Sequence, residues 1–173
     1  MGVCKKCGKP TLGTYEYCLN CKPMSSKSAP TSGYSAGYRS GSVRGLPPEC
    51  IFKDSFYASD GYLKKEIFMG AAQKMSLEFQ SEGMTQTSIR HLFNMIKAIE
   101  MRLKADKDLS LGFVRENFYK FVTHTEYQTN RGVLRPLFKE FIESHSDLAV
   151  KDKKEFKGFV EYLTSIVARM KQK

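Results

Sequence analysis

Four cysteines near the start of the chain have the spacing of a metal site. Cys4 and Cys7 form one C-x2-C pair, and Cys18 and Cys21 form a second pair after ten intervening residues. A gap of two residues lets both thiolates of one tight turn bind the same tetrahedral ion, and two such turns complete its coordination shell. The spacing therefore predicts a small zinc ribbon over residues 1–22, in which these four cysteines bind one structural zinc ion.

Redox chemistry is the alternative for paired cysteines. Redox C-x-x-C pairs usually lie at a strand-to-helix turn of a thioredoxin-like fold, and no such pattern surrounds these pairs. A module of about twenty residues has almost no core, so metal binding must supply its folding energy. Four thiolates also leave no open coordination position for catalysis. The fifth cysteine, Cys50, stands alone and is expected to be an ordinary thiol.

The composition changes after the cysteine region. Residues 22–48 hold seven Ser, four Gly and four Pro among 27 positions. Such a segment buries too little apolar surface to offset the loss of chain entropy. We therefore expect a flexible linker over residues 23–50, followed by a separate domain over residues 51–173.

The rest of the chain has the apolar periodicity of helices. No segment after residue 50 shows the sustained alternation of a strand, so the predicted fold class is all-α, a helical bundle of about five helices preceded by the four-cysteine zinc ribbon. The predicted helices start near Leu63, at the N-cap Thr85, near Phe113, near Leu134, and at Asp152, which with Glu155 resembles a capping box.

Net charge and hydropathy indicate the cellular compartment and the kind of partner that the chain can have. The net charge of +10 favours polyanions without identifying one. No apolar run approaches the length that spans a bilayer, and the first residues lack the apolar core of a secretory signal. Together with paired thiols at metal spacing, these features predict a cytoplasmic protein without a membrane partner.

Two of the predicted helices carry basic residues in narrow bands. A row of cations with an interleaved aromatic ring suits a phosphate backbone, and the ring is available to pack a sugar or a base. Charged rows are also commonly no more than the solvated face of a helix. The first band holds Arg90, Asn94, Lys97 and Lys104, and the second holds Lys120, His124, Tyr127 and Arg131. The candidate RNA-binding residues are Arg90, Lys97, Lys120 and Arg131.

No constellation of reacting groups accompanies these bands. His91, His124 and His145 are expected at the surface or half-buried, and no carboxylate cluster, nucleophile–histidine arrangement or phosphate loop lies beside them in the sequence. We therefore expect a protein that is not an enzyme.

Three stretches of the helical region resemble a known family. They are MTQTSIRHLFNMIK (Met84–Lys97), YQTNR (Tyr127–Arg131) and the aromatic final helix from Lys154 to Met170. In order and spacing the set resembles the small subunit of type III-A CRISPR effector complexes, the Csm-type small subunit, over residues 55–171. The zinc ribbon and the linker depart from the single-domain pattern of that family.

The resemblance implies a non-catalytic helical bundle that lines up beside the backbone subunits of an RNA-guided complex. Its implied partners are CRISPR guide RNA, target RNA, other subunits of the effector complex and further copies of itself. Arg90 and Arg131 match family positions, whereas Lys97 and Lys120 follow from the basic bands alone. The alternative hypothesis is a zinc-ribbon adaptor whose helical domain binds only protein.

The metal prediction is directly measurable. Protein purified without chelator is expected to contain about one zinc per chain by elemental analysis, and well under one zinc would contradict the four-thiolate site. The variant Cys4→Ser should unfold the ribbon and leave the helical circular dichroism almost unchanged, because a linker uncouples the two modules.

Overall fold

The computed structural model describes residues 2–3, 10–11 and 45–171 of the chain. The chain divides into two units, Met1–Ser42 and Val43–Lys173. In the first unit, β1 (Gly2–Val3) pairs antiparallel with β2 (Pro10–Thr11). The predicted zinc ligands lie outside the described residues, as does most of the predicted linker, so the zinc ribbon stays a prediction.

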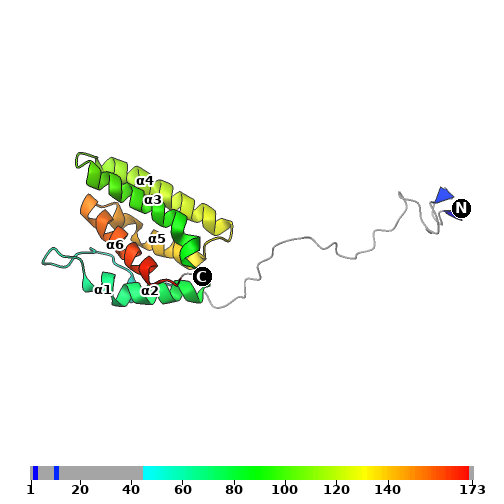
Figure 1. Ribbon diagram of the computed structural model, residues 1–173, viewed down its shortest axis with the longest axis horizontal. Coiled ribbons are helices and arrows are strands. Elements are labelled where there is room, and N and C mark those ends of the chain that lie inside the picture. Colours follow the sequence, from blue (N-terminus) through cyan, green and yellow to red (C-terminus); the bar gives the residue numbers. More distant parts are fainter. Residues whose placement is uncertain (1, 4–9, 12–44, 172–173) are drawn as a thin grey trace. The chain divides into compact units, whose positions relative to one another are not determined.

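The second unit is a bundle of α-helices, which confirms the predicted all-α fold class. Figure 1 shows α3 and α4 as a neighbouring pair, with α6 lying between that pair and α2. The elements of this unit are a 3-10 helix, η1 (Pro48–Cys50), and the α-helices α1 (Lys65–Phe68), α2 (Gly70–Ser81), α3 (Gln86–Ala105), α4 (Leu111–Asn130), α5 (Pro136–Ala149) and α6 (Lys153–Arg169).

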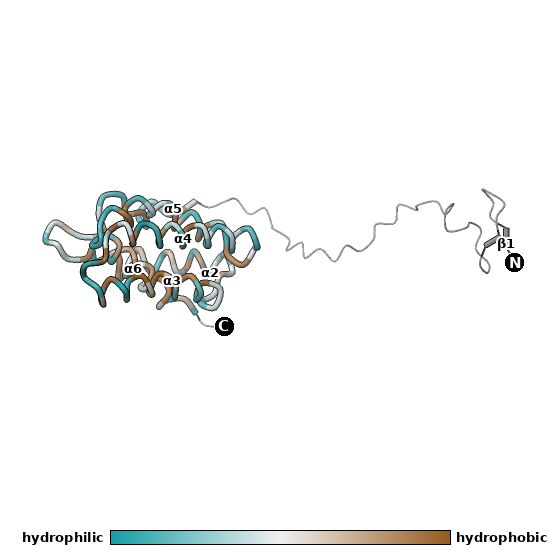
Figure 2. Tube along the Cα trace, turned by 90° about the horizontal axis from the view of Figure 1, so that it is seen from above, coloured by the Kyte–Doolittle hydropathy of each residue, from teal (hydrophilic) through white to brown (hydrophobic). Residues whose placement is uncertain are grey.

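Helix α6 forms the centre of the bundle and contacts α1, α2, α3, α4 and α5. Its apolar residues recur every three or four positions, and Figure 2 shows hydrophobic residues gathered where the helices face one another. Burial of each large side chain of this kind stabilises the fold by about 1.5–3 kcal/mol. The buried apolar residues of α6 are Phe156, Phe159, Val160, Tyr162, Leu163, Ile166 and Val167.

Local signals explain most helix ends. Thr85 caps α3 in a reciprocal capping box with Ser88, as its position before the apolar stripe predicts. Gly83 follows α2 with φ of +79°, a conformation that glycine adopts without steric cost. The predicted first helix, however, is divided into α1 and α2. Met69 leaves the helical region at φ −127° and ψ −100°, and Gly70 after it is a weak helix former.

The packed domain begins earlier than the sequence predicts. Residues 46–64, here called the strap, run along the bundle before α1, and Leu46, Cys50, Phe52 and Phe56 are buried in the core. A predicted boundary at residue 50 is therefore too late. The sequence around Leu46 is rich in Pro and Gly, so its few apolar residues do not form a pattern that predicts packing. Cys50, expected as an ordinary thiol, is buried, and burial raises the pKa of its thiol to about 11.

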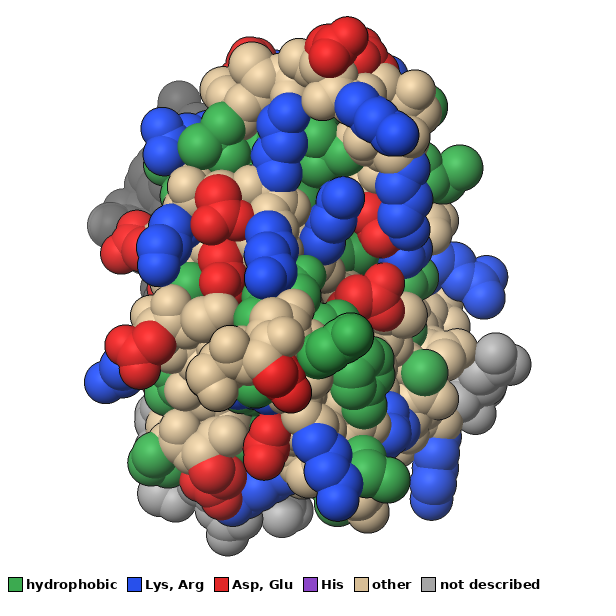
Figure 3. Space-filling model, turned by 90° about the vertical axis from the view of Figure 1, so that its left-hand side faces the viewer, with side chains coloured by type: hydrophobic (Ala, Val, Ile, Leu, Met, Phe, Trp, Pro, Cys, Tyr) green, Lys and Arg blue, Asp and Glu red, His purple; other side chains and the backbone are tan. Residues whose placement is uncertain are grey.

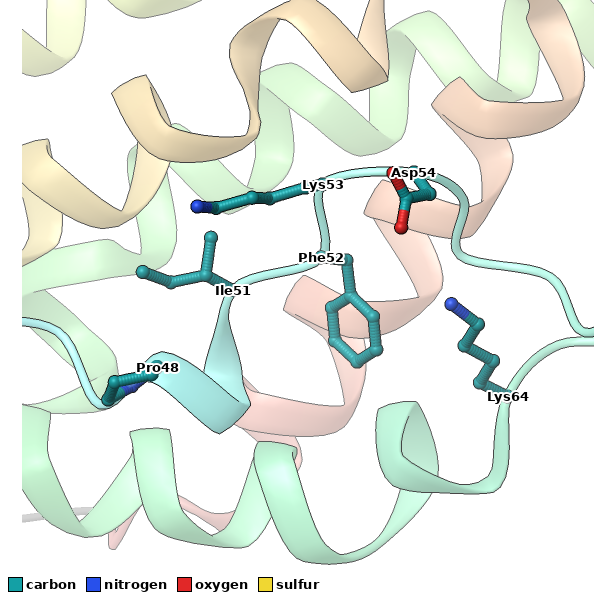
Figure 4. A pocket seen from close by; sticks show the side chains of 6 residues that line it. All are labelled: Pro48, Ile51, Phe52, Lys53, Asp54 and Lys64. Carbon is teal, nitrogen blue, oxygen red and sulfur yellow. The ribbon is translucent and has the colours of Figure 1, made fainter.

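Side chains of α5 and α6 hold the strap by its backbone. The amide of Phe52 donates to His145 Nε2 at 3.2 Å, and the Tyr162 hydroxyl donates to the Cys50 carbonyl at 3.0 Å. The Glu155 carboxylate accepts from the Phe56 amide at 2.9 Å. These bonds satisfy backbone groups that a strand or helix would otherwise pair. Figure 4 shows Phe52 of the strap, with Lys64 across a shallow hollow from it.

Glu155 therefore does not complete the predicted capping box. Asp152 does cap α6, because its carboxylate accepts from the Glu155 amide at 2.8 Å. The side chain of Glu155 instead turns toward the strap and also accepts from the Ser55 hydroxyl at 2.5 Å. A tertiary bond to buried backbone thus replaces the local bond that the sequence pattern predicts.

Gly158 allows the strap to approach α6 closely. A Cβ atom at this position would lie 2.6 Å from Cβ of Phe56, closer than real carbon contacts. Phe56 is fully buried and packs near Phe159 and His145, so it has no free space in which to move away.

His145 lies fully buried inside this aromatic cluster, whereas it was expected at the surface or half-buried. Its Nδ1 is 2.7 Å from the Phe141 carbonyl, and its Nε2 accepts from Phe52, an arrangement that requires a neutral ring with the proton on Nδ1. Burial lowers the pKa of His145 below its usual range, although the hydrogen bond to Phe141 opposes that shift.

Acid is expected to destabilise the domain through His145. The unfolded chain takes up a proton near pH 6.5, but the folded chain does not until the pH falls to the lower folded pKa. This contribution to stability is complete above about pH 6.5 and falls by about 1.4 kcal/mol for each pH unit below it, until the folded pKa is reached.

Chemical denaturation at several pH values measures this slope, and His145→Gln removes the titrating group while keeping an acceptor. Stability is plotted against pH for both proteins. Below pH 6.5 and above the folded pKa, the difference between the two slopes gives the contribution of His145. An NMR titration in which the His145 ring of the folded wild type protonates at its ordinary pKa would contradict the assignment.

Candidate nucleic-acid interface

A row of planar side chains links α3 and α4 at the surface. The His91 and His124 rings have centroids 5.0 Å apart, and the Tyr127 ring lies 6.0 Å from that of His124. The Arg131 guanidinium carbon lies 5.4 Å from the centre of the Tyr127 ring. We call His91, His124, Tyr127 and Arg131 the planar row. It joins the first half of α3 to the last turns of α4, which run in opposite directions.

A shallow groove runs along α4 beside this row. It encloses about 550 Å³ and has mostly apolar walls. Tyr119 and Tyr127 are 54% and 53% exposed, so both rings are open to a ligand. The groove is lined by Glu116, Tyr119, Lys120, Thr123, His124 and Tyr127.

Arg90 and Arg131 lie on the solvent side of this region. Both are exposed, and neither makes an ion pair within the part of the chain that the structure describes. Arg90 directly precedes His91 on α3, and Arg131 caps the end of α4. An arginine that has no carboxylate partner presents its guanidinium donors to an incoming anion.

Lys97 is placed differently from these arginines. Its ammonium lies 2.5 Å from one oxygen of Glu100, and the Lys104 ammonium lies 2.6 Å from the other. The Glu100 side chain is only 2% exposed. Burial opposes its ionisation, but hydrogen bonds from Lys104 and Lys97 keep the pKa of Glu100 below its usual range. Lys97 therefore neutralises a buried carboxylate. The negative charge of Glu100 offsets part of the positive charge in the basic band of α3.

Lys120 also has a carboxylate partner, but that partner is exposed. Its ammonium lies 2.5 Å from Glu116, and both side chains are more than 60% exposed. The hydrogen bond from Lys120 lowers the pKa of Glu116. An exposed pair of this kind contributes little to stability and opens readily. Lys120 thus stays accessible to a ligand. Lys97 could bind a ligand only by leaving the buried Glu100 carboxylate.

A second basic region, which the sequence analysis missed, lies at the other end of α3 and α4. Lys153 donates to the Lys107 carbonyl at 3.2 Å, and Arg115 donates to the Val150 carbonyl at 3.1 Å. These bonds bring the α3–α4 loop and the start of α6 together, and Figure 3 shows Lys and Arg side chains gathered on this end of the molecule. The run KDKK at residues 151–154 is the sequence feature that could have predicted this basic region.

Residues 2–3, 10–11 and 45–171 contain no group of three or more His, Cys, Asp or Glu side chains placed to hold a metal ion. Among the helices that the structure describes, none has the length and apolar character needed to cross a membrane.

The fold and this surface define a class: a small all-α bundle with an exposed basic and aromatic face on one helix pair. The family model described as Csm2 Type III-A matches residues 63–172, which is more than half of the chain. The protein therefore belongs to the Csm2 family and is a type III-A CRISPR small subunit, as the three sequence stretches predicted. Searches of curated proteins and of solved structures gave no significant match.

The pairing of Glu100 leads to a prediction about RNA affinity. In Glu100→Gln, two lysines lose their buried counter-ion and the surface gains one positive charge, so affinity for RNA should rise and its salt dependence should steepen. Loss of the charge-assisted bonds should lower the free energy of unfolding by about 1 kcal/mol.

Filter binding at several salt concentrations measures the first effect and urea denaturation the second. Glu143→Gln, which removes an exposed carboxylate paired with Lys139, is the matched control. Equal effects of the two substitutions on affinity would show that only total charge matters.

Proposed function

We propose that this protein is a non-catalytic small subunit that contacts guide and target RNA through the outer face of α3 and α4. The observation that carries the proposal is the planar row ending in Arg131, with Arg90 exposed beside it, on a member of the Csm2 family. Guanidinium groups bind phosphates with two parallel hydrogen bonds, and planar rings pack on sugars and bases. Family membership and surface chemistry thus favour the same ligand.

The site chemistry supports a binding role and not catalysis. The His124 ring packs against the rings of His91 and Tyr127 and lies 3.2 Å from the Gln128 amide nitrogen, contacts that suit binding. Reactions on RNA need a placed nucleophile, base or metal. In this proposal, any cutting of RNA or DNA belongs to other subunits.

Packing against other subunits is the second part of the proposal. Phe68, Met69 and Leu77 are 41%, 54% and 58% exposed on α1 and α2, away from the α3–α4 pair. Exposed large apolar side chains leave water when they pack against protein, which favours such contact. This face suits the backbone subunits of the complex or further copies of the chain.

The amino-terminal cysteines extend the proposal. Cys4, Cys7, Cys18 and Cys21 are proposed to bind zinc in a ribbon that recruits a further component of the complex. The adaptor hypothesis differs in one respect: the helical domain would then bind protein alone and would not require the exposed arginines.

Arginine substitutions test the RNA contact. The double variant Arg90→Ala plus Arg131→Ala is expected to weaken RNA binding, because two phosphate contacts are lost. Each lost contact should flatten the log–log salt dependence by about 0.7 for a single strand, with a similar loss for every RNA sequence. Surface changes of this kind alter stability by less than about 0.5 kcal/mol, so circular dichroism should be unchanged.

Lys65→Ala on α1 removes one exposed cation elsewhere and serves as the control. Fluorescence anisotropy with labelled RNA, repeated on the assembled complex, gives the affinity and the salt slope. Unchanged affinity and slope in the double variant, in both settings, would transfer support to the adaptor hypothesis.

A further inference from the structure

We infer that the groove along α4 holds unpaired bases of an RNA strand, with Tyr119 and Tyr127 as two stacking platforms. This inference rests on the proposed function and adds to it the kind of RNA that the α3–α4 face binds. It concerns nucleotides whose bases lie outside a double helix. The groove, the exposure of the two rings and the charge balance of its walls carry it.

The two rings are placed as separate platforms. Tyr119 and Tyr127 lie eight residues apart on α4, which corresponds to about 12 Å along the helix axis. Both are more than half exposed and both line the same groove. Because every base has a flat apolar face, an exposed tyrosine ring accepts any base without regard to sequence. The distance between the rings exceeds that between neighbouring stacked bases, so the rings hold bases that are not adjacent in one stack.

The charge balance of the groove favours bases over phosphates. Glu116 and Lys120 face each other across 2.5 Å inside the groove, so its walls carry no net charge. The Lys120 ammonium attracts a phosphate and the Glu116 carboxylate repels it, so the closed pair gives a phosphate no net attraction. A base is uncharged, and its edge offers amino groups to a carboxylate and ring acceptors to an ammonium. The groove chemistry therefore fits base faces and base edges.

The cations lie where the phosphates of the same strand would pass. Arg131 stacks on Tyr127 at the end of the groove, and Arg90 lies on α3 next to His91 of the planar row. A strand with two bases on the tyrosines would bring its backbone toward these guanidinium groups. The groove, whose charges balance, would thus bind the bases, and the arginines at its end would bind the phosphates.

A continuous RNA duplex does not meet these requirements. Its bases are stacked inside, and proteins bind it through phosphates and 2′-hydroxyls along its grooves. Rings that project from a helix face add no stacking energy to such a ligand. The occupant of the groove is therefore a single strand, or a nucleotide turned out of a duplex.

Binding of the full chain to two labelled RNAs tests the inference, one a single strand and the other a perfect duplex of equal length. The variant Tyr119→Leu keeps the groove apolar and removes a platform ring that lies outside the planar row. Single-strand affinity should fall about fivefold or more, and duplex affinity should not change. The salt slope should stay as in the wild type, because no phosphate contact is lost.

Tyr62→Leu, at an exposed tyrosine before α1, is the matched control and should bind both RNAs as the wild type does. A single strand in which abasic sites replace the bases should bind the wild type and the tyrosine variant equally. Circular dichroism confirms that the variant is folded.

The outcomes separate this inference from the proposed function. If the tyrosine variant binds both RNAs normally while Arg90→Ala plus Arg131→Ala does not, base stacking is refuted and the phosphate contact stands. If the tyrosine variant binds RNA normally but fails to join the effector complex, the groove docks a protein and the inference is overturned. If the arginine and tyrosine variants both bind RNA normally, the proposed function fails together with the inference.

Discussion

One constraint shapes the architecture. Only a narrow side of α6, with Lys154, Lys157 and Ala168, is exposed, and its broad apolar face must be covered. Helices α1 to α5 cover most of it, and the strap covers the rest by placing Phe52 and Phe56 against it. An irregular segment in a core needs partners for its backbone, and His145, Glu155 and Tyr162 supply them. With α6 enclosed in this way, α3 and α4 keep one outer face free for a ligand.

Net charge alone does not identify that face, because the partner of each cation decides whether it is available. Lys97 stays beside Glu100, which is buried and would keep only Lys104 as a counter-ion if Lys97 moved away. Lys120 has an exposed partner in Glu116 and exchanges it at little cost. Arg131 stacks on Tyr127 and has no carboxylate partner within the described residues. These three cations look alike in the sequence but differ in their partners: a buried carboxylate, an exposed carboxylate and an aromatic ring.

The match to the Csm2 family begins at residue 63, yet the packed domain begins with Leu46. The strap therefore lies almost wholly outside the family match and still supplies four buried side chains to the core. Removal of the strap would expose the part of α6 that Phe52 and Phe56 cover.

The sequence by itself determined the helical fold class, the N-cap at Thr85, the family and the exposed positions of Arg90 and Arg131, since periodicity and motif order are local properties. It did not determine the strap or the burial of His145, because these depend on contacts between residues about a hundred positions apart. The planar row is likewise a tertiary result. His91 and His124 belong to different helices, and only the packing of α3 against α4 brings their rings together.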